Sequence, residues 1–251
     1  MKIQLKSKEE IERIRIAGSI LADCHKEIAK AIKPGVSTAD IDKLVEVYLA
    51  DRGAIPAQKG YRGFPYATCA SVNEVVCHGF PGPTPLEAGD IVTIDIVVNK
   101  GGWLADSAWS YRVGDVSPEA ERLLKVTESA LAAGIEAARP GGRVGDIGYA
   151  VQEVARKAGL GIVKPLIGHG IGRKMHEPPD VPNFGRARSG AKLQAGMVIT
   201  IEPIFTLGDT GAVFWDQDGW TIRSADGSLG AHYEHTLAIT EQGPVILTKQ
   251  S

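Results

Sequence analysis

Two pairs of short segments repeat along the chain at nearly the same separation, and this repeat restricts the possible folds more than any other feature. PGVSTADI at 34–41 resembles PGGRVGDI at 140–147, a shift of 106 residues. AGDIVTID at 88–95 resembles AGMVITIE at 195–202, a shift of 107 residues. Two copies of so long a unit do not make a solenoid. The repeat predicts two similar halves folded against each other, with chance similarity of short helix starts and apolar strands as the alternative.

Each half has the same expected order of two helices followed by strands. Helical spacing of apolar residues, cap residues such as Ser37 or Thr38 and the Pro-Gly breaks define the helices, and apolar runs define the strands. We predict helices at 8–32, 38–53, 118–138 and 144–158, and strands at 67–77, at 90–113 and from the last helix to the end. The expected α/β (α+β) chain is one domain, 1–251, with halves at about 1–114 and 115–251.

Composition and charge argue against several functional classes. Hydrophobic residues make up 43% and charged residues 23%, with a net charge of -2, which is ordinary for a globular protein and gives no broad basic surface for nucleic acid. The first residues lack the apolar core of a signal peptide, and no run approaches the ~18 apolar residues of a membrane span. Three cysteines without CxxC spacing argue against disulfides and a thiolate zinc site. We expect a cytoplasmic protein with reduced thiols.

Two aspartates interrupt apolar strands on either side of a hairpin signal. Asp95 lies in IVTIDIVV and Asp106 in WLADSAWSYRV, separated by NKGG. If Lys100 and Gly101 form the two-residue loop, Asp95 lies directly opposite Asp106, with Cβ atoms ~5 Å apart. Two like charges held so closely require either a shared proton or a cation. We favour a cation.

Two further acids occur in similar surroundings. Glu202 lies in MVITIEPIF and Glu234 in LGAHYEHTLAIT. A solvated strand face or an ordinary ion pair would explain any one of these acids, but four of them without matching Lys or Arg indicate divalent metal. His169, between glycines that let the backbone approach closely, is a candidate fifth ligand rather than a structural histidine. This donor set suits Mn, Fe(II), Co or Zn.

Other motifs that could carry chemistry do not fit. The glycines at 168–172 have the wrong spacing for a dinucleotide loop, and HEPP at 176–179 lacks the second histidine of HExxH. There is no GxSxG and no P-loop. Cys77 beside His78 suggests a thiol nucleophile, but neighbours in a strand point to opposite faces. We expect Cys77 to be a buried structural residue.

The ordered set of five ligands, together with its surrounding motifs, resembles the methionine aminopeptidase family, type I and bacterial. The motifs are SVNEVVCHGFPG at 71–82, GHGIGRxxHExP from 168, TIEPIF at 200–205 and YEHT at 233–236. The resemblance spans essentially the whole chain, with no additional N-terminal domain and no long insertion between His169 and Glu202. It implies a pseudo-two-fold "pita-bread" fold around a central antiparallel sheet. It also implies removal of the initiator methionine from nascent proteins.

The resemblance also implies roles for single residues. A water or hydroxide that bridges two divalent ions would attack the first peptide bond. Asp95 would bind one ion, His169 and Glu202 the other, and Asp106 and Glu234 both. Glu202 would be the general base. His176 would contact the scissile carbonyl and His78 the amide beyond it, with a satisfied structural histidine as the alternative for each.

The methionine pocket implied by the resemblance has an apolar and aromatic wall, formed by Tyr61, Phe64, Cys69 and Trp220 together with His78 and His176. This chain departs from the family pattern at two positions. Met175 stands where an aromatic residue is common, and Gln58 where a smaller or less polar residue is expected. We expect these changes to broaden side-chain selectivity without altering the metal chemistry.

Two alternative functions stay open at this point. A proline-directed peptidase would share the fold family, although such relatives usually carry an additional N-terminal domain. A non-catalytic protein that engages ribosome or RNA would need no metal ligands, yet all five are present. The expected partners are therefore peptide and nascent-chain N-termini, without membrane or specific nucleic acid, for a monomer. Transient ribosome association can accompany such catalysis, but the sequence does not show it.

Overall fold

The computed structural model describes residues 3–249 and consists of four long helices and fifteen short to medium strands. The helices are α1 (Lys8–Ala31), α2 (Thr38–Ala50), α3 (Pro118–Ala137) and α4 (Val144–Ala158), with one 3-10 turn, η1 (Tyr61–Gly63). The strands are β1 (Ile55–Pro56), β2 (Cys69–Val72), β3 (Val75–Cys77), β4 (Ile91–Lys100), β5 (Trp103–Arg112), β6 (Gly161–Ile162), β7 (Gly168–Gly170), β8 (Glu177–Val181), β9 (Val198–Ile201), β10 (Ile204–Thr206), β11 (Val213–Trp215), β12 (Ile222–Ser224), β13 (Gly230–His232), β14 (His235–Thr240) and β15 (Gly243–Ile246).

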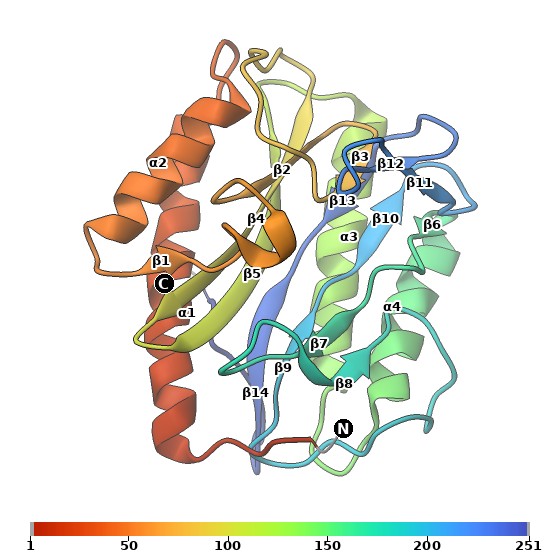
Figure 1. Cartoon of the computed structure of the whole chain (residues 1–251). Helices are drawn as coiled ribbons and strands as arrows, with labels where there is room; N and C mark the ends of the chain where they lie inside the picture. Colours follow the sequence, from red (N-terminus) through yellow and green to blue (C-terminus); the bar gives the residue numbers. More distant parts are fainter. Residues whose placement is uncertain (1–2, 250–251) are drawn as a thin grey trace.

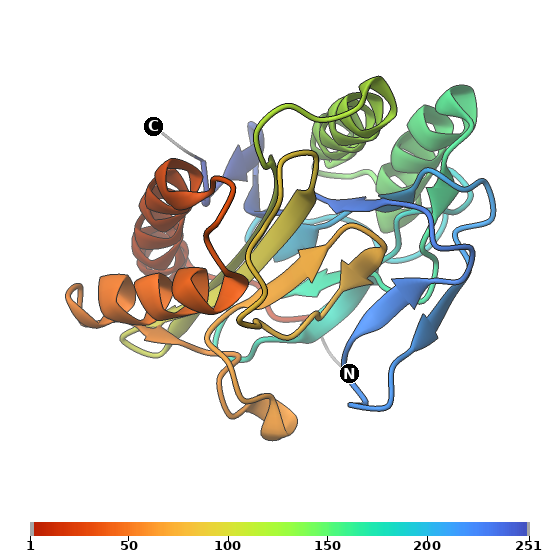
Figure 2. The ribbon, with the colours of Figure 1, turned by 90° about the horizontal axis from the view of Figure 1, so that it is seen from above.

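The helices lie outside the sheets, with α1 and α2 on one side of the molecule and α3 and α4 together on the other (Figures 1 and 2). Every strand pair is antiparallel, and the strands form four hydrogen-bonded sets. The two largest are β1-β4-β2, with β5 beside β4, and β15-β14-β9-β7-β8. The predicted α/β fold with antiparallel sheet between paired helices is confirmed, although the sheet is divided rather than continuous.

The internal repeat is visible in the backbone hydrogen bonds. Leu86 exchanges bonds with Gly35 and Val36 before α2, and Leu193 exchanges the corresponding bonds with Gly141 and Gly142 before α4. Isolated bridges recur in the same way, between Ser37 and Pro85 and between Arg143 and Lys192. Each half therefore joins the start of its second helix to the segment before a central strand, β4 in the first half and β9 in the second. The similar sequences have similar structures.

Helix boundaries follow local signals closely. Ser37, rather than Thr38, caps α2: its hydroxyl accepts from the Asp40 amide, and the Asp40 carboxylate accepts from the Ser37 amide. α4 ends at Gly159, which has the left-handed φ of 65° that glycine adopts without strain. The buried face of α1 packs on β4 and β5, with α2 against α1 and β1. In the second half α3 packs on β9, β10 and β13, with α4 against α3, β6 and β8. The apolar residues of these elements form two hydrophobic clusters.

The β4–β5 hairpin differs from the sequence prediction. Its loop is Gly101-Gly102, not Lys100-Gly101, and Lys100 pairs with Trp103. Both loop residues have positive φ, 61° and 81°, a combination that two glycines adopt readily and a lysine does not. Consequently Asp95 pairs with Ala108, and Asp106 pairs with Val97. The predicted direct pairing of the two aspartates is wrong.

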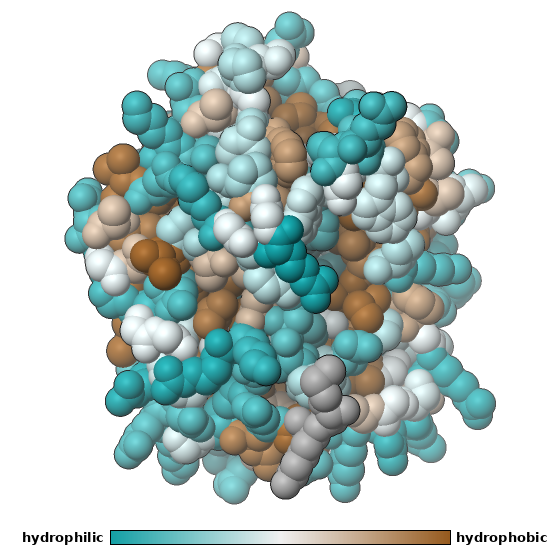
Figure 3. Space-filling model, viewed as in Figure 1, coloured by the Kyte–Doolittle hydropathy of each residue, from teal (hydrophilic) through white to brown (hydrophobic). Residues whose placement is uncertain are grey.

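The surface seen in Figure 3 is mainly hydrophilic, with apolar residues in small separate groups. The larger exposed apolar side chains are scattered over several elements; they include Leu5, Val47, Ile55 and the adjacent pair Phe214 and Trp215. Within residues 3–249, no helix is both long enough and apolar enough to cross a membrane.

Candidate metal centre

Asp95 and Asp106 face the same side of the hairpin even though they are not directly paired. Residues two apart in a strand share a face, so Asp106, opposite Val97, is the diagonal neighbour of Asp95. Burial, and then the nearby charge of Asp95, raises the pKa of Asp106 well above its usual range. Two carboxyl groups placed in this way require either a retained proton or a cation. Asp95 and Asp106 therefore lie at one site, as predicted, but in a different strand register from the predicted one.

Strands of the second half complete the cluster. The Glu234 amide donates to the Ala108 carbonyl, and the Thr236 hydroxyl accepts from the Asp106 amide and donates to its carbonyl. These bonds fix the segment from Glu234 into β14 against β5, at the centre of the molecule. Asp106 and Glu234 are thereby held side by side, 6% and 2% exposed.

His169 and Glu202 are oriented by a shared threonine. The Thr200 hydroxyl accepts from the His169 amide at 2.9 Å and donates to Glu202 Oε1 at 2.8 Å. His169 Nδ1 lies 2.9 Å from the Gly170 carbonyl, a contact that places the proton on Nδ1 and leaves Nε2 as an acceptor. Nε2 faces Glu202 Oε1 at 3.7 Å and Asp106 Oδ2 at 3.9 Å, both too long for hydrogen bonds.

The electrostatics of the cluster favour a bound cation. Burial raises the pKa of Asp95 to about 7 and that of Glu202 to about 8, and it raises the pKa values of Asp106 and Glu234 well above the usual range. Burial lowers the pKa of His169 to about 3, so its imidazole is neutral and able to bind metal. Among residues 3–249, no Lys or Arg forms an ion pair with any of the four acids.

Unsatisfied buried atoms test whether the site suits a metal. Asp106 Oδ1, Glu234 Oε1 and both ring nitrogens of His232 are buried without a hydrogen-bond partner. Such atoms are costly unless something binds them. Ligand atoms of Asp106, His169 and Glu234 lie within 4.8 Å of one another, and so do those of Cys77, Asp95 and His232. The oxygen-rich donors with added nitrogen fit divalent transition metals.

All predicted site residues line one cavity of about 320 Å³. Phe64 packs edge to face with Trp220 at a centroid distance of 5.1 Å, and Cys69 lies beside Asp95 on β2. Both departures noted from the family pattern, Gln58 and Met175, also line this cavity. The Gln58 amide is committed to the backbone of β4, since Nε2 donates to the Asp95 carbonyl and Oε1 accepts from the Val97 amide.

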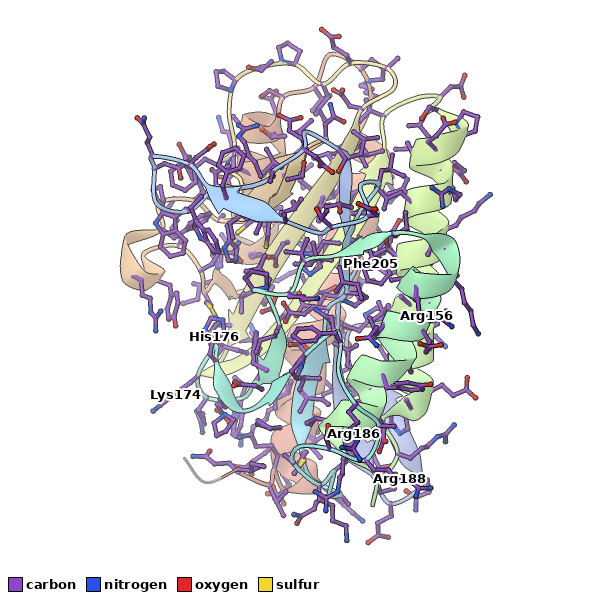
Figure 4. The ribbon with its side chains drawn as sticks, turned by 90° about the vertical axis from the view of Figure 1, so that its right-hand side faces the viewer. Arg156, Lys174, His176, Arg186, Arg188 and Phe205 are labelled. Atoms are coloured by element: carbon purple, nitrogen blue, oxygen red, sulfur yellow. The ribbon has the colours of Figure 1, made fainter. Side chains whose placement is uncertain are left out.

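The two remaining histidines lie at the cavity wall. His176 is exposed on the segment that leads into β8, well away from Arg156 of α4 (Figure 4), and its Nδ1 contacts the Tyr61 hydroxyl at 3.0 Å. Its ring lies 4.3 Å from that of His169, centroid to centroid. His78 packs edge to face against Trp220. Burial lowers the pKa of His78 to about 4, so it is neutral.

Cys77 and His232 were not predicted at the site. The sequence predicted opposite faces for Cys77 and His78 because neighbours in a strand alternate. However, β3 ends at Cys77, and His78 has a positive φ of 54°, so both side chains line the cavity. His232 stands two residues before Glu234, and this spacing is the only sequence signal that could have indicated it. Arg62, on η1, is also at the cavity wall.

Comparison with known proteins gives one consistent family. The sequence profile of metallopeptidase family M24 matches residues 12–241. The methionine aminopeptidase of Clostridium perfringens is 45% identical over 246 residues, covering 98% of each chain. The crystal structure of the Rickettsia prowazekii methionine aminopeptidase superposes with a TM-score of 0.97 at 40% identity, covering 99% of this chain and 100% of that one.

A more distant similarity extends to a prolidase from Pyrococcus furiosus, with a TM-score of 0.78 and 25% identity; it covers 98% of this chain but 66% of the prolidase. The profile match, the full-length sequence identity and the buried carboxylate and histidine cluster agree. The chain therefore belongs to metallopeptidase family M24 and, within it, to the methionine aminopeptidases.

Proposed function

We propose that this chain hydrolyses the first peptide bond of polypeptides that begin with methionine, using two divalent metal ions. The observation that carries the proposal is the convergence of four acids and His169, from both halves of the chain, beside an aromatic cavity; Asp106 and Glu234 are buried, and Asp95 and Glu202 are partly buried. In the proposed assignment Asp95 would help to hold one ion and His169 and Glu202 the other, and Asp106 and Glu234 would be shared. When bound, such ions lower the pKa of water and polarise a carbonyl group.

The side chains around the ions carry the proton and orient the substrate. Glu202, fixed at Oε1 by Thr200, accepts the proton of the attacking water and returns it to the leaving amine nitrogen. His176, oriented by Tyr61, donates a hydrogen bond to the oxygen on which negative charge develops. His78 contacts the amide on the far side of the bond. Each of these proposed roles requires the side chain to be held close to the scissile bond.

The aromatic wall suits a flexible thioether side chain. Tyr61, Phe64 and Trp220 present ring faces and edges that sulfur contacts favourably, and Cys69 contributes a small apolar surface. Met175 is 8% exposed at the same cavity and is itself flexible. We propose that Met175 and Gln58 give this pocket a broader side-chain preference than an all-aromatic wall would.

The cellular setting is part of the same proposal. We propose a monomer of one domain, 1–251, with halves at about 1–114 and 115–251, that acts in the cytoplasm on nascent chains. The support is the three free cysteines, which suit a reducing compartment, and the location of new polypeptide N-termini there. The proposed metals are Mn, Co, Fe(II) and Zn.

The test is release of free methionine from Met-Ala- and Met-Gly-headed peptides, with each metal added separately to chelator-treated protein. We expect turnover with at least one metal and none with chelator. Xaa-Pro peptides serve as the comparison, because the prolidase similarity predicts their cleavage. Faster hydrolysis of Xaa-Pro than of Met-headed peptides, or no turnover with any metal, would refute the proposal.

A further inference from the structure

A second set of metal-binding atoms adjoins the predicted centre. It consists of Cys77 at the end of β3, Asp95 in β4 and His232 at the end of β13. One ligand atom from each lies within 4.8 Å of the others. Asp95 thus belongs both to the acidic cluster and to a group with sulfur and nitrogen donors. Of the three residues, only Asp95 is a ligand in the assignment above.

His232 lacks the partners that buried histidines normally have. It is 2% exposed, and neither ring nitrogen forms a hydrogen bond. Its nearest acidic atom, Glu234 Oε2, is 3.9 Å from Nε2. By contrast, buried His25 contacts Tyr111 and Ser107, and buried His235 contacts Thr248. An imidazole enclosed without partners is costly, so its position indicates a ligand that binds to it.

Cys77 differs from the other two cysteines in its surroundings. Cys24 lies in the hydrophobic cluster under α1, and Cys69 accepts a hydrogen bond from Gln58 Nε2. Cys77 is 4% exposed, lines the cavity and has a carboxylate and an imidazole beside its sulfur. A buried thiol among such groups is the usual composition of a mixed site for a transition metal.

We propose that Cys77 and His232 are additional ligands of the ion held by Asp95. This inference rests on the proposed two-metal function and adds sulfur and nitrogen donors to one side of the centre. The Cys77 thiol loses its proton to solvent when the ion binds. The two ions are then held unequally, one with thiolate, imidazole and carboxylate, the other with His169 and carboxylates. The site that contains Asp95, Cys77 and His232 should therefore bind Zn or Co more tightly than Mn.

Spectroscopy of the unmodified protein tests the proposal without any peptide. The protein is loaded with two equivalents of Zn and examined by X-ray absorption, and separately with Co(II) and examined by optical absorption. We expect one sulfur neighbour at ~2.3 Å for about half of the zinc. We also expect a thiolate-to-cobalt charge-transfer band. A fully loaded protein without either sulfur signal would overturn the proposal, whether or not the protein cleaves peptides.

Variants then assign the signals to residues. Cys77→Ser should remove the sulfur signals, and both Cys77→Ser and His232→Gln should weaken one of two calorimetric binding steps by at least ~10-fold, leaving the other step unchanged. Calorimetry in buffers of different ionisation enthalpy should show one proton fewer released by Cys77→Ser. Cys24→Ala, a buried thiol remote from the cavity, is the matched control and should keep both signals and both affinities.

The outcomes separate this proposal from the proposed function. Sulfur ligation by a protein that cleaves no Met-headed peptide would support the inference and refute the function. Full methionine release with no sulfur signal would support the proposed function and refute the sulfur ligation. If His232→Gln raises only KM and leaves both metal affinities unchanged, His232 contacts substrate rather than metal, and its assignment as a ligand is wrong. Circular dichroism and thermal unfolding confirm that each variant is folded.

Discussion

His176 is the clearest case of a single side chain whose role can be separated from metal binding. It is exposed at the cavity wall, is oriented by the Tyr61 hydroxyl and packs beside His169 without sharing its carboxylate neighbours. We expect His176→Ala to lower kcat about 100-fold, since loss of one donor to a developing oxyanion has about this effect. Steady-state kinetics on a Met-Ala-headed peptide measure the change in kcat, and elemental analysis measures the metal bound to the variant. Loss of bound metal in the variant would contradict this role.

His25 should make the protein sensitive to acid for reasons unrelated to catalysis. It is fully buried between Tyr111 and Ser107, and burial lowers its pKa to about 4 from an ordinary value near 6.5. The unfolded chain therefore binds a proton that the folded chain does not, so stability from neutral His25 is present above pH ~6.5 and is lost as the pH falls toward about 4.

A His25→Gln variant measures this contribution, because glutamine fills a similar space and does not titrate. Between pH 8 and pH 5, the free energy of unfolding of the unmodified protein should fall about 2 kcal/mol more than that of the variant. Urea unfolding at several pH values gives both curves, and effects common to the two proteins cancel in the difference. Parallel curves would show that His25 does not titrate in this way.

The segment between β7 and β8 is held by a buried ion pair at its far end. Lys6 Nζ pairs with Glu177 Oε2, both side chains being almost fully buried, and Glu177 Oε1 accepts from the Arg173 and Lys174 amides. The segment that follows Lys174 carries Met175 and His176 into the cavity wall. Lys6 thus helps to fix the segment that carries His176, a proposed catalytic residue.

Lys6→Met should destabilise the protein by about 3 kcal/mol, because it leaves a buried carboxylate without its cation. Adding Glu177→Gln to Lys6→Met should recover part of the loss. The matched control is Lys59→Met, which removes an exposed pair with Glu46 and should change stability by less than ~1 kcal/mol. Chemical denaturation compares the three variants with the unmodified protein. Equal losses of stability from Lys6→Met and Lys59→Met would show that the buried ion pair stabilises the fold no more than the exposed one.

Local patterns in the sequence were sufficient to predict most elements but not the register between them. Helical periodicity and cap residues gave α1, α3 and α4 to within about two residues, since both act over a few turns. The predicted β4–β5 register was wrong because NKGG contains two possible two-residue loops. The positive φ of both Gly101 and Gly102 selects the Gly101-Gly102 loop. That choice depends on backbone strain, which apolar alternation does not report.

The candidate site was predictable where its residues interrupt a pattern. Asp95 and Asp106 interrupt the strands β4 and β5, as predicted. Glu202 and Glu234 were also predicted inside strands, but they lie in the breaks between β9 and β10 and between β13 and β14. All four line one cavity. His232 breaks no such pattern in the sequence. A histidine before a tyrosine in a strand has many ordinary structural explanations. Its proximity to Cys77 and Asp95 arises from contacts between β13, β3 and β4, which lie far apart in the sequence. Such a neighbourhood exists only after the two halves are assembled.

The metal centre should also contribute to the cohesion of the whole molecule. Asp95 and Asp106 come from the first half, whereas His169, Glu202 and Glu234 come from the second, so an ion bound by them would link the two halves. A ligand that binds only the folded state at 100 times its Kd adds about 2.7 kcal/mol to stability. Removal of metal should therefore lower Tm by roughly 5–10 °C for a chain of this size.

Differential scanning calorimetry of chelator-treated and reloaded protein at pH 7.5 measures this shift. The control is an Asp106→Asn variant, which lacks a carboxylate proposed to contact both ions and should show little dependence of Tm on added metal. Because Asp106 is also buried among like charges, its metal-free variant should melt no lower than the metal-free unmodified protein. A metal-dependent increase of Tm that is equally large in Asp106→Asn would place the stabilising ion elsewhere in the chain.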